Sequence, residues 1–301
     1  MTKKMIIKQD TVTFSLFRTM LFVAALFLGA LTACTSSKGI TSTPQITDDS
    51  DFIPDEFAWQ PVAPGIDRFD FENTALPLIY HAVRIDLANE ALELVYYPDL
   101  QTKIDKSDHF TGMTTLDFAR RNKCTVAINA SPFDGRFRRK KIIGLHSIDH
   151  TVLATPNNRY AALAFSKATD GKGYIAHIIK NQTADCAENF DFVFGGFFAV
   201  LTDKVILPYN EIYNSRTGAG ISQDGKTLYL LLVEGEDPSR STGLTYPQCG
   251  KIFAAMGCTN ALEFDGGGSS QLCINGASVL NYKTTRLQAN SFGFRTSLEE
   301  D

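Results

Sequence analysis

The sequence predicts an α+β fold in which mixed, largely antiparallel sheets and a few packed helices form a single domain of the catalytic type. Most apolar runs are short and end at turns rich in Gly, Asn or Asp, which is typical of strands joined in antiparallel order. Two segments have helical spacing and capping residues. With 301 residues and 44% hydrophobic composition, the chain fits one large domain or two small ones, and we expect one.

The amino terminus is typical of a lipoprotein signal peptide. Basic residues precede an apolar run at 20–31, which is too short to span a bilayer stably. The run ends in Leu-Thr-Ala-Cys at 31–34, which resembles a bacterial lipobox. A plain secretory signal with an incidental cysteine is the alternative. We expect residues 1–33 to be removed, Cys34 to carry lipid, and the protein to be anchored in the bacterial cell envelope, with the membrane leaflet left open.

Composition then separates a tether from a folded body. Residues 34–61 are rich in Ser, Thr, Pro and Asp and predict a flexible tether, followed by the domain at 62–301. Without its first 33 residues the chain has a formal charge of −7, which argues against nucleic acid as a partner. The exception is a run of Arg and Lys at 136–141. Such a run is usually a solvated face, or it holds an anionic substrate.

Cysteine and histidine spacing gives no sign of a metal centre. Five cysteines besides Cys34 have no Cys-x-x-Cys pair, so they form at most two disulfides, and we expect several to be buried thiols. The five histidines lack metal-ligand spacing. We therefore expect no cofactor, while metal dependence stays open.

The first half of the domain begins with two alternating runs, 77–86 and 91–97, which predict a β-hairpin. A helix follows over 115–122, capped by Thr114 or Thr115. The next apolar run, 125–129, predicts a buried strand that ends at Asn129 and delivers Asp134 into a Pro/Gly loop. The alternative for Asn129 is that it closes an Asx turn.

Further strands and a second helix follow. The helix begins at Thr245, a good N-cap, and Gly257 suits its C′ position. Its apolar residues recur at i, i+3, i+4 and i+7, so this face belongs to the core. We expect strands at 160–166, 173–179, 204–207, 214–221, 227–234, 261–265, 271–274 and 277–280, and 190–201 is an apolar run around Gly195 and Gly196.

The most informative segment is the strand at 261–265, which ends at Asp265 and runs into Gly266, Gly267 and Gly268. Three consecutive glycines cost conformational entropy, and a fold tolerates them where the backbone turns with positive φ or approaches a ligand. A strained loop in an ordinary hairpin is the alternative. Because a strand and no helix follows, the segment is neither a P-loop nor a dinucleotide fingerprint.

Polar side chains stand at the ends of several predicted strands. Two carboxylates and an arginine suit a reaction in which an anionic group departs, because the arginine neutralises that group and the acids assist at the carbon it leaves. We expect these residues to line one cleft. They are Asn129, Asp134, Arg216, Glu234, Asp265, Ser269 and Ser270.

The order of these segments resembles the phosphodiester glycosidase family over about 77–294. The matching elements are the strand ending at Asn129, the Gly195-Gly196 pair, Arg-Thr-Gly-Ala-Gly at 216–220, the strand ending in Glu234-Gly235, and Asp-Gly-Gly-Gly-Ser-Ser at 265–270. The chain departs from the family where Asn-Ala replaces Asn-Gly at 129–130. It departs again at 234–236, where Glu-Gly-Glu stands in place of Asp-Gly-Arg.

The resemblance implies hydrolysis of a sugar-1-phosphodiester to free sugar and a phosphomonoester. It implies Arg216 on the phosphate and Asp265 and Glu234 as nucleophile or base. Asn129, Asp134, Ser269, Ser270 and the backbone of Gly266, Gly267 and Gly268 would bind the substrate. The partners would be a sugar-phosphate or envelope glycan and, through the lipid, a membrane. A non-catalytic glycan-binding lipoprotein and a factor in exopolysaccharide or cell-wall glycan assembly are the alternatives.

The lipobox makes a direct prediction. If Cys34 is acylated, Cys34→Ser leaves an unprocessed precursor that no longer incorporates labelled fatty acid in cells. Equal labelling of the two forms would contradict the anchor.

Overall fold

Short antiparallel strands make up most of the structure, a computed structural model that describes residues 46, 48–169, 171–209 and 211–296. Every strand pairing among these residues is antiparallel. The expectation of α+β with mixed sheets is therefore too broad, and the fold is mostly β. The expected signal peptide and Cys34 lie outside the described residues.

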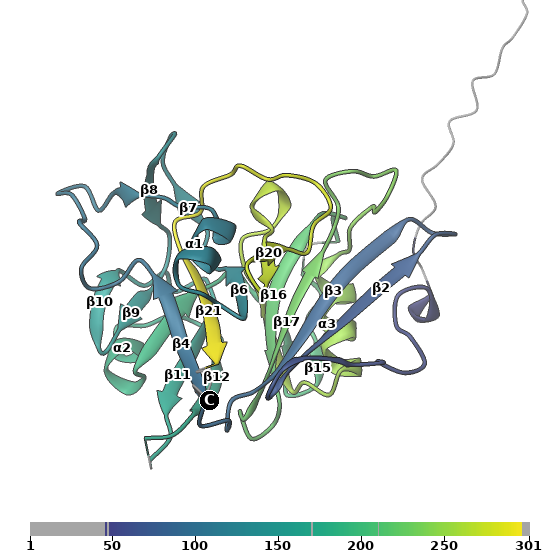
Figure 1. The fold of residues 1–301 in the computed structure, drawn as a ribbon, viewed down its shortest axis with the longest axis horizontal. Coiled ribbons are helices and arrows are strands. Elements are labelled where there is room, and N and C mark those ends of the chain that lie inside the picture. The colour runs from purple at the N-terminus through teal and green to yellow at the C-terminus, as the bar shows by residue number, and fades with distance from the viewer. Residues whose placement is uncertain (1–45, 47, 170, 210, 297–301) are drawn as a thin grey trace, which may run out of the picture. The chain divides into compact units, whose positions relative to one another are not determined.

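The largest sheet has eight strands, and Arg216, Glu234 and Asp265 lie on its strands or directly after them. In Figure 1 its central strands, β16 and β17, stand beside the long pair β2 and β3. In spatial order the strands are β1 (Gln60–Ala63), β2 (Ile66–Asn73), β3 (Leu78–Asp86), β17 (Thr227–Val233), β16 (Arg216–Ile221), β18 (Asn260–Glu263), β14 (Ala199–Thr202) and β15 (Val205–Ile206).

Two sheets of five strands and one of three complete the fold. The first has the order β10 (Thr151–Ala154), β9 (His146–Ile148), β13 (Phe192–Gly195), β11 (Ala162–Lys167) and β12 (Tyr174–Ile179). The second has the order β20 (Ala277–Ser278), β19 (Leu272–Ile274), β6 (Val126–Asn129), β21 (Ser291–Thr296) and β4 (Leu92–Tyr97). The small sheet has the order β5 (Phe110–Thr111), β8 (Arg139–Ile142) and β7 (Phe133–Asp134).

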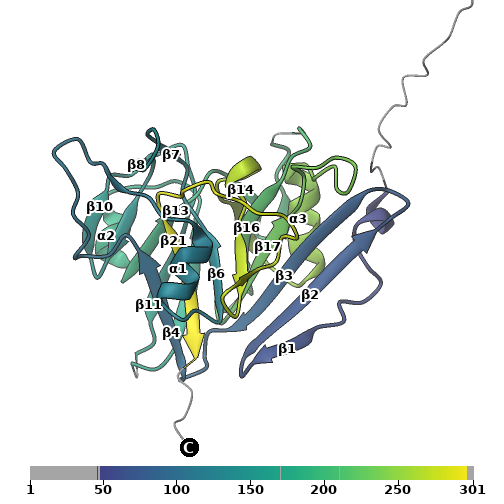
Figure 2. The ribbon, with the colours of Figure 1, turned by 45° about the horizontal axis from the view of Figure 1, so that its top comes forward.

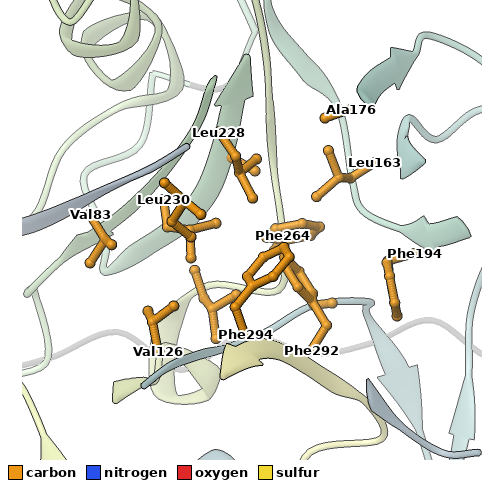
Figure 3. Close-up of a cluster of buried hydrophobic side chains, with 14 of the residues drawn as sticks. Val83, Val126, Leu163, Ala176, Phe194, Leu228, Leu230, Phe264, Phe292 and Phe294 are labelled. Atoms are coloured by element: carbon orange, nitrogen blue, oxygen red, sulfur yellow. The ribbon is translucent and has the colours of Figure 1, made fainter. Parts of the chain in front are cut away.

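One apolar core joins the three large sheets. Because side chains alternate across a strand, each of these sheets turns one set of apolar residues toward the others, and these meet around Phe264 and Phe292 (Figure 3). The Phe292 ring is fully buried, with its centre 5.7 Å from that of Phe264 and 4.9 Å from that of Phe194. The labelled members are Val83, Val126, Leu163, Ala176, Phe194, Leu228, Leu230, Phe264, Phe292 and Phe294.

Three α-helices in the described part of the chain cover outer sheet faces (Figure 2). α3 (Tyr246–Ala255) packs on the eight-stranded sheet through the predicted apolar face, and Thr245 and Gln248 form a capping box at its start. Gly257 follows with φ +98°, as expected of a C′ glycine. α1 (Thr115–Arg121) packs on the sheet of β6 and has Thr114 as its cap. α2 is Asp185–Asn189.

The predicted hairpin at 77–97 is wrong, although both of its strands exist. β3 lies between β2 and β17 in the eight-stranded sheet, whereas β4 pairs with β21 in another sheet. β3 pairs with β2 along one edge and with β17 along the other, so neither edge is left for β4. The connection at Leu87 is tied to the rest of the fold by backbone bonds with Lys226 and Tyr174. The turn that follows β3 leads from one sheet to another and does not close a hairpin.

The tether expected over 34–61 ends earlier than predicted. Ile46 and Phe52 are 2% and 1% exposed, and Tyr80 donates a hydrogen bond to the Phe52 carbonyl. Trp59 packs with the same cluster before β1 begins at Gln60. The segment is polar on average, so its composition predicted a tether. Its few large apolar side chains are nevertheless enough to fix it on the eight-stranded sheet.

The five cysteines from Cys124 onward are all buried and free, which confirms the expectation of buried thiols. Among the described residues, no helix combines the length and hydropathy that crossing a membrane requires.

The meeting point of the sheets makes a prediction about stability. Phe292→Ala opens a cavity between them and should lower the free energy of unfolding by about 3–5 kcal/mol, measured by denaturant titration. The same substitution at Phe137, which is 92% exposed, is the control and should change it little. Equal effects of the two would contradict this account of the core.

Candidate active site

The backbone of Asp265 is fixed from three directions where the chain leaves β18. Its amide donates to the Ala130 carbonyl at 2.8 Å. Its carbonyl accepts from Asn129 Nδ2 at 2.7 Å and from Thr217 Oγ1 at 3.0 Å. Asn129 is the last residue of β6, Ala130 follows it and Thr217 lies in β16, so two sheets hold the backbone of Asp265. The Asp265 side chain is thereby aimed by rigid elements.

The glycines that follow pack against the neighbouring chain. A Cβ on Gly266 would lie 2.7 Å from the Ser215 carbonyl oxygen. Gly267 has φ +57° and donates its amide to the same oxygen at 2.9 Å. A larger residue at 266 would push the turn off β16, and one at 267 would strain the backbone. The turn continues as a 3₁₀ helix, η2 (Gly267–Ser269).

A pocket of about 380 Å³ opens on this turn. The glycines supply one wall and a segment near the end of the chain supplies the other, so ligand oxygens can approach the main chain without meeting a Cβ. The lining residues are Glu236, Gly267, Gly268, Ser270, Tyr282, Lys283, Thr284, Thr285 and Arg286.

Buried amides place the second wall of this pocket. Gln271 is 1% exposed and donates from Nε2 to the Arg286 carbonyl at 2.9 Å. Gln288, 2% exposed, donates to the Ser269 carbonyl at 3.0 Å. Buried donors need partners. These two bonds therefore tie residues 282–286, which include Lys283 and Arg286, to the glycine turn.

The Asp265 carboxyl has an unusual affinity for protons. Burial raises its pKa to about 6, against the opposing effects of the Ser269 hydroxyl and the Arg286 charge. The Ser269 hydroxyl lies beside that carboxyl without reaching full hydrogen-bond geometry, and the hydroxyls of Ser269 and Ser270 are buried without a partner in the described chain. A carboxyl that titrates near neutral pH suits acid–base work.

Glu263, two residues earlier, escaped the sequence reasoning. It is fully buried, and neither carboxyl oxygen has a hydrogen-bond partner of standard geometry among the described residues. Burial raises its pKa to about 8, although the Arg216 charge and the Cys249 thiol favour the ionised form. The alternation of a strand would have put Glu263 and Asp265 on one face, but an apolar run hid the signal.

Arg216 lies beneath the site and outside the lining of the glycine-turn pocket. Its side chain is buried, donating from Nε to the Leu244 carbonyl at 2.9 Å and also to the Ile212 carbonyl. The guanidinium carbon lies 4.4 Å from the centre of the Tyr246 ring. These two carbonyls use part of the donor set of the guanidinium, and the expected role of Arg216 on a phosphate stays a prediction.

Glu234 begins a chain of ionisable groups that runs outward. Its Oε1 lies 3.2 Å from His81 Nε2, and His81 Nδ1 lies 2.6 Å from Asp70 Oδ1. Arg240 approaches Oε2 at 3.5 Å. Burial lowers the pKa of His81, but the hydrogen bonds to Asp70 and Glu234 outweigh it, so the pKa is raised overall.

The register of the eight-stranded sheet brings Arg216, Glu234 and Asp265 to the same end of three neighbouring strands. Arg216 pairs with Val233, next to Glu234, and Gly218 pairs with Glu263, so the start of β16 meets the ends of β17 and β18. Asn129 joins them through Asp265. It was expected to bind substrate, but its Oδ1 accepts from the Gln271 amide at 2.9 Å and its Nδ2 holds Asp265.

Other expected residues divide between two places. Gly267, Gly268 and Ser270 line the glycine-turn pocket, whereas Asp134 lines a neighbouring one. Glu236 was noted only as a departure from the family, and it accepts from Ser215 Oγ at 3.1 Å at the pocket wall. Arg286 and Tyr282 had no sequence signal. Burial and the charges of Glu234 and Glu236 raise the pKa of Tyr282 to about 12.

Within the described ranges, no three His, Cys, Asp or Glu residues are arranged to hold a metal ion.

The buried Glu263 makes a prediction about pH. An ordinary glutamate titrates near 4.5, so the unfolded chain releases this proton first and the stability of the native state falls as pH rises from about 4.5 to 8. Glu263→Gln removes that loss. The variant should gain about 2–4 kcal/mol over the parent at pH 8 and little at pH 4, measured by unfolding across pH. A difference independent of pH would contradict an ionisable, buried Glu263.

Comparisons with known proteins agree with this geometry. Residues 122–295, more than half of the chain, match the sequence model of the phosphodiester glycosidase family. The SPbeta prophage-derived uncharacterized protein YomE of Bacillus subtilis is 28% identical over 208 residues, which is 61% of this chain and 30% of YomE. The chain thus spans under a third of that curated relative.

Two solved structures share the fold. A hypothetical protein from Synechocystis superposes with a TM-score of 0.60 at 13% identity, covering 79% of this chain and 63% of that one. The zebrafish N-acetylglucosamine-1-phosphodiester α-N-acetylglucosaminidase catalytic domain, auto-inhibited by its pro-peptide, superposes with a TM-score of 0.56 at 17% identity, covering 77% and 83%. With the glycine turn at Asp265 inside the matched region, the chain belongs to the phosphodiester glycosidase family.

Proposed function

We propose that this protein hydrolyses the glycosidic bond of a sugar-1-phosphodiester and releases free sugar and a phosphomonoester. The observation that carries the proposal is the pairing of Asp265, whose pKa is about 6, with a glycine-walled pocket that contains Arg286 and Lys283. A carboxyl near neutrality and two cations beside exposed main chain fit a phosphate leaving group.

We assign the phosphate to Arg286 and Lys283. Both line the glycine-turn pocket, whereas Arg216 is bound to carbonyls beneath it. No carboxylate lies within ion-pair distance of Arg286 or Lys283 in the described chain. Their charge is therefore free for an anion. These two cations also offset Glu236, which stands where the family commonly has arginine.

Arg216 and Asn129 are positioning residues in this scheme. Arg216 anchors the start of β16 through Leu244 and Ile212, and Asn129 fixes the Asp265 peptide. The charge of Glu234 contributes to the raised pKa of Tyr282, a residue of the pocket lining. Its carboxylate is oriented by His81 and Arg240. It is the second carboxylate of the site, in reach of a proton path through His81 to Asp70.

The chemistry follows from the leaving group. A phosphomonoester is a weak base, so the bond from C1 to its oxygen breaks with the electron pair leaving on phosphate, where Arg286 and Lys283 neutralise it. Water supplies the new bond at C1 and its proton passes to the ionised Asp265. No strong general acid is needed, which suits a pocket whose basic groups outnumber its one carboxylate.

The substrate and the cellular address remain parts of the proposal. The zebrafish neighbour is named for an N-acetylglucosamine-1-phosphodiester, so this sugar is the first probe to use. The lipobox at 31–34 supports an envelope location with a membrane anchor, where phosphodiester-linked glycans would be within reach.

The central prediction concerns Asp265→Asn. The amide keeps the shape but cannot accept the proton, so turnover of methyl N-acetylglucosamine-1-phosphodiester should fall by about 10²-fold or more, while thermal unfolding at pH 7 is not lowered. Turnover by the parent should also decline as pH drops below about 6, because Asp265 becomes protonated there.

Asp55→Asn, on an exposed segment, is the matched control and should be normal in both assays. A destabilised Asp265→Asn variant with near-normal turnover would make Asp265 part of the scaffold. Tight binding of the diester by the parent without release of sugar would instead favour a glycan-binding or assembly role.

A further inference from the structure

The basic run at 136–141 is divided by strand geometry into two groups. Side chains on β8 alternate between faces, and Arg139 and Lys141 point to one of them. Arg139 forms an ion pair with Asp105, and Lys141 Nζ lies 2.8 Å from Asp108 Oδ2. These two cations are therefore neutralised by the loop between β4 and β5.

The other group carries charge without a counterion. Lys140 is 7% exposed, and its Nζ lies 4.6 Å from the centre of the Phe133 ring. The Arg286 guanidinium carbon lies 5.4 Å from the centre of the same ring. In the described part of the chain, neither Lys140 nor Arg138 has a carboxylate within ion-pair distance. Burial and the nearby Arg286 charge both lower the pKa of Lys140, so two cations stand close together.

These cations face a pocket of about 510 Å³ that adjoins the candidate active site. The pocket shares Thr285 and Arg286 with the glycine-turn pocket. Three cations and one carboxylate line it, which gives a formal charge of +2. The Asp134 carboxylate accepts from the Gly135 amide at 2.6 Å. The lining residues are Phe133, Asp134, Gly135, Phe137, Arg138, Lys140, Thr285, Arg286 and Leu287.

We propose that this pocket, the Lys140 pocket, is a second anion subsite that binds a phosphate on the part of the substrate beyond the scissile phosphodiester. The inference rests on the proposed function. It names the substrate class as a glycan with at least two phosphodiesters in sequence. Arg286 lies between the two pockets and contacts both phosphates or the group that links them.

Three physical features support an anion here. A phosphate would relieve the repulsion between Lys140 and Arg286, since in the described chain neither cation forms an ion pair and the lining as a whole keeps a positive charge. Arg138 offers the fork of donors that suits phosphate oxygens. Phe137 is 92% exposed at the rim, with φ +51°, so a sugar ring laid against it would remove apolar surface from water.

The test compares two probes that differ by one phosphate. One is methyl N-acetylglucosamine-1-phosphodiester, and the other is the same sugar phosphate linked to a second N-acetylglucosamine-1-phosphate methyl diester. We expect kcat/KM for the two-phosphate probe, divided by that for the one-phosphate probe, to fall about tenfold in Lys140→Met, the scale of one lost charged hydrogen bond.

Lys141→Met is the matched control, one residue away on the opposite face and paired with Asp108, and it should leave the ratio unchanged. Arg138→Gln provides a second variant at an exposed position, which keeps the test informative if Lys140→Met does not fold. An unchanged ratio in a folded Lys140→Met, or in Arg138→Gln where it alone folds, would overturn the subsite. An equal fall with Lys141→Met would do the same.

Binding separates this inference from the proposed function. If neither probe is cleaved, calorimetry with the same two probes still measures the subsite on the intact domain. Tighter binding of the two-phosphate probe that Lys140→Met abolishes and Lys141→Met keeps would support the Lys140 pocket while the hydrolase assignment fails. Equal affinity for the two probes would overturn the pocket itself.

Discussion

The carbonyl oxygen of Asp265 is the point on which the candidate site depends. It accepts hydrogen bonds from Asn129 at the end of β6 and from Thr217 in β16, so it joins a five-stranded sheet to the eight-stranded one. A buried backbone carbonyl beyond the end of a strand has no partner in the sheet. Without another donor it would cost the folded state several kcal/mol. Here both donors come from strands, and so the start of the three-glycine turn is fixed to two sheets.

This arrangement explains how the fold keeps two carboxyl groups with raised pKa values on one strand end. Glu263 is enclosed beneath α3 beside Arg216 and Cys249, and Asp265 lies two residues before the first glycine that lines the glycine-turn pocket. Ionising either group away from water is unfavourable. The apolar core around Phe264 and Phe292 lies on the opposite face of the same strand, and its packing offsets that cost. The two carboxyl groups with raised pKa values and the apolar core thus lie on opposite sides of β18.

Local signals predicted most of the elements and only part of the site. The cap at Thr245, the period of α3 and the hairpin of β16 and β17 depend on neighbouring residues, and all three are confirmed. The pairing of β3 and β4 was wrong because strand partners are chosen by tertiary packing. β2 and β21 have apolar residues too but no turn signal strong enough to define them. The three glycines predicted the turn at the site. The sequence could not predict the pocket shared by Lys140 and Arg286, because these residues are far apart in the chain and come together only in the folded protein.

The carboxylates and the cations of the candidate site lie on different kinds of element, and this difference concerns specificity. The groups assigned to bond cleavage stand on strand ends, where sheet register fixes their spacing. The cations assigned to phosphate lie on connecting segments, held by Gln271 through one carbonyl. Glu236 occupies the position where the family commonly has arginine, and the glycine-turn pocket receives its positive charge from Lys283 and Arg286 instead. Positive charge at this pocket is thus supplied by loops, which can change length and sequence without disturbing the strands that carry Asp265 and Glu234.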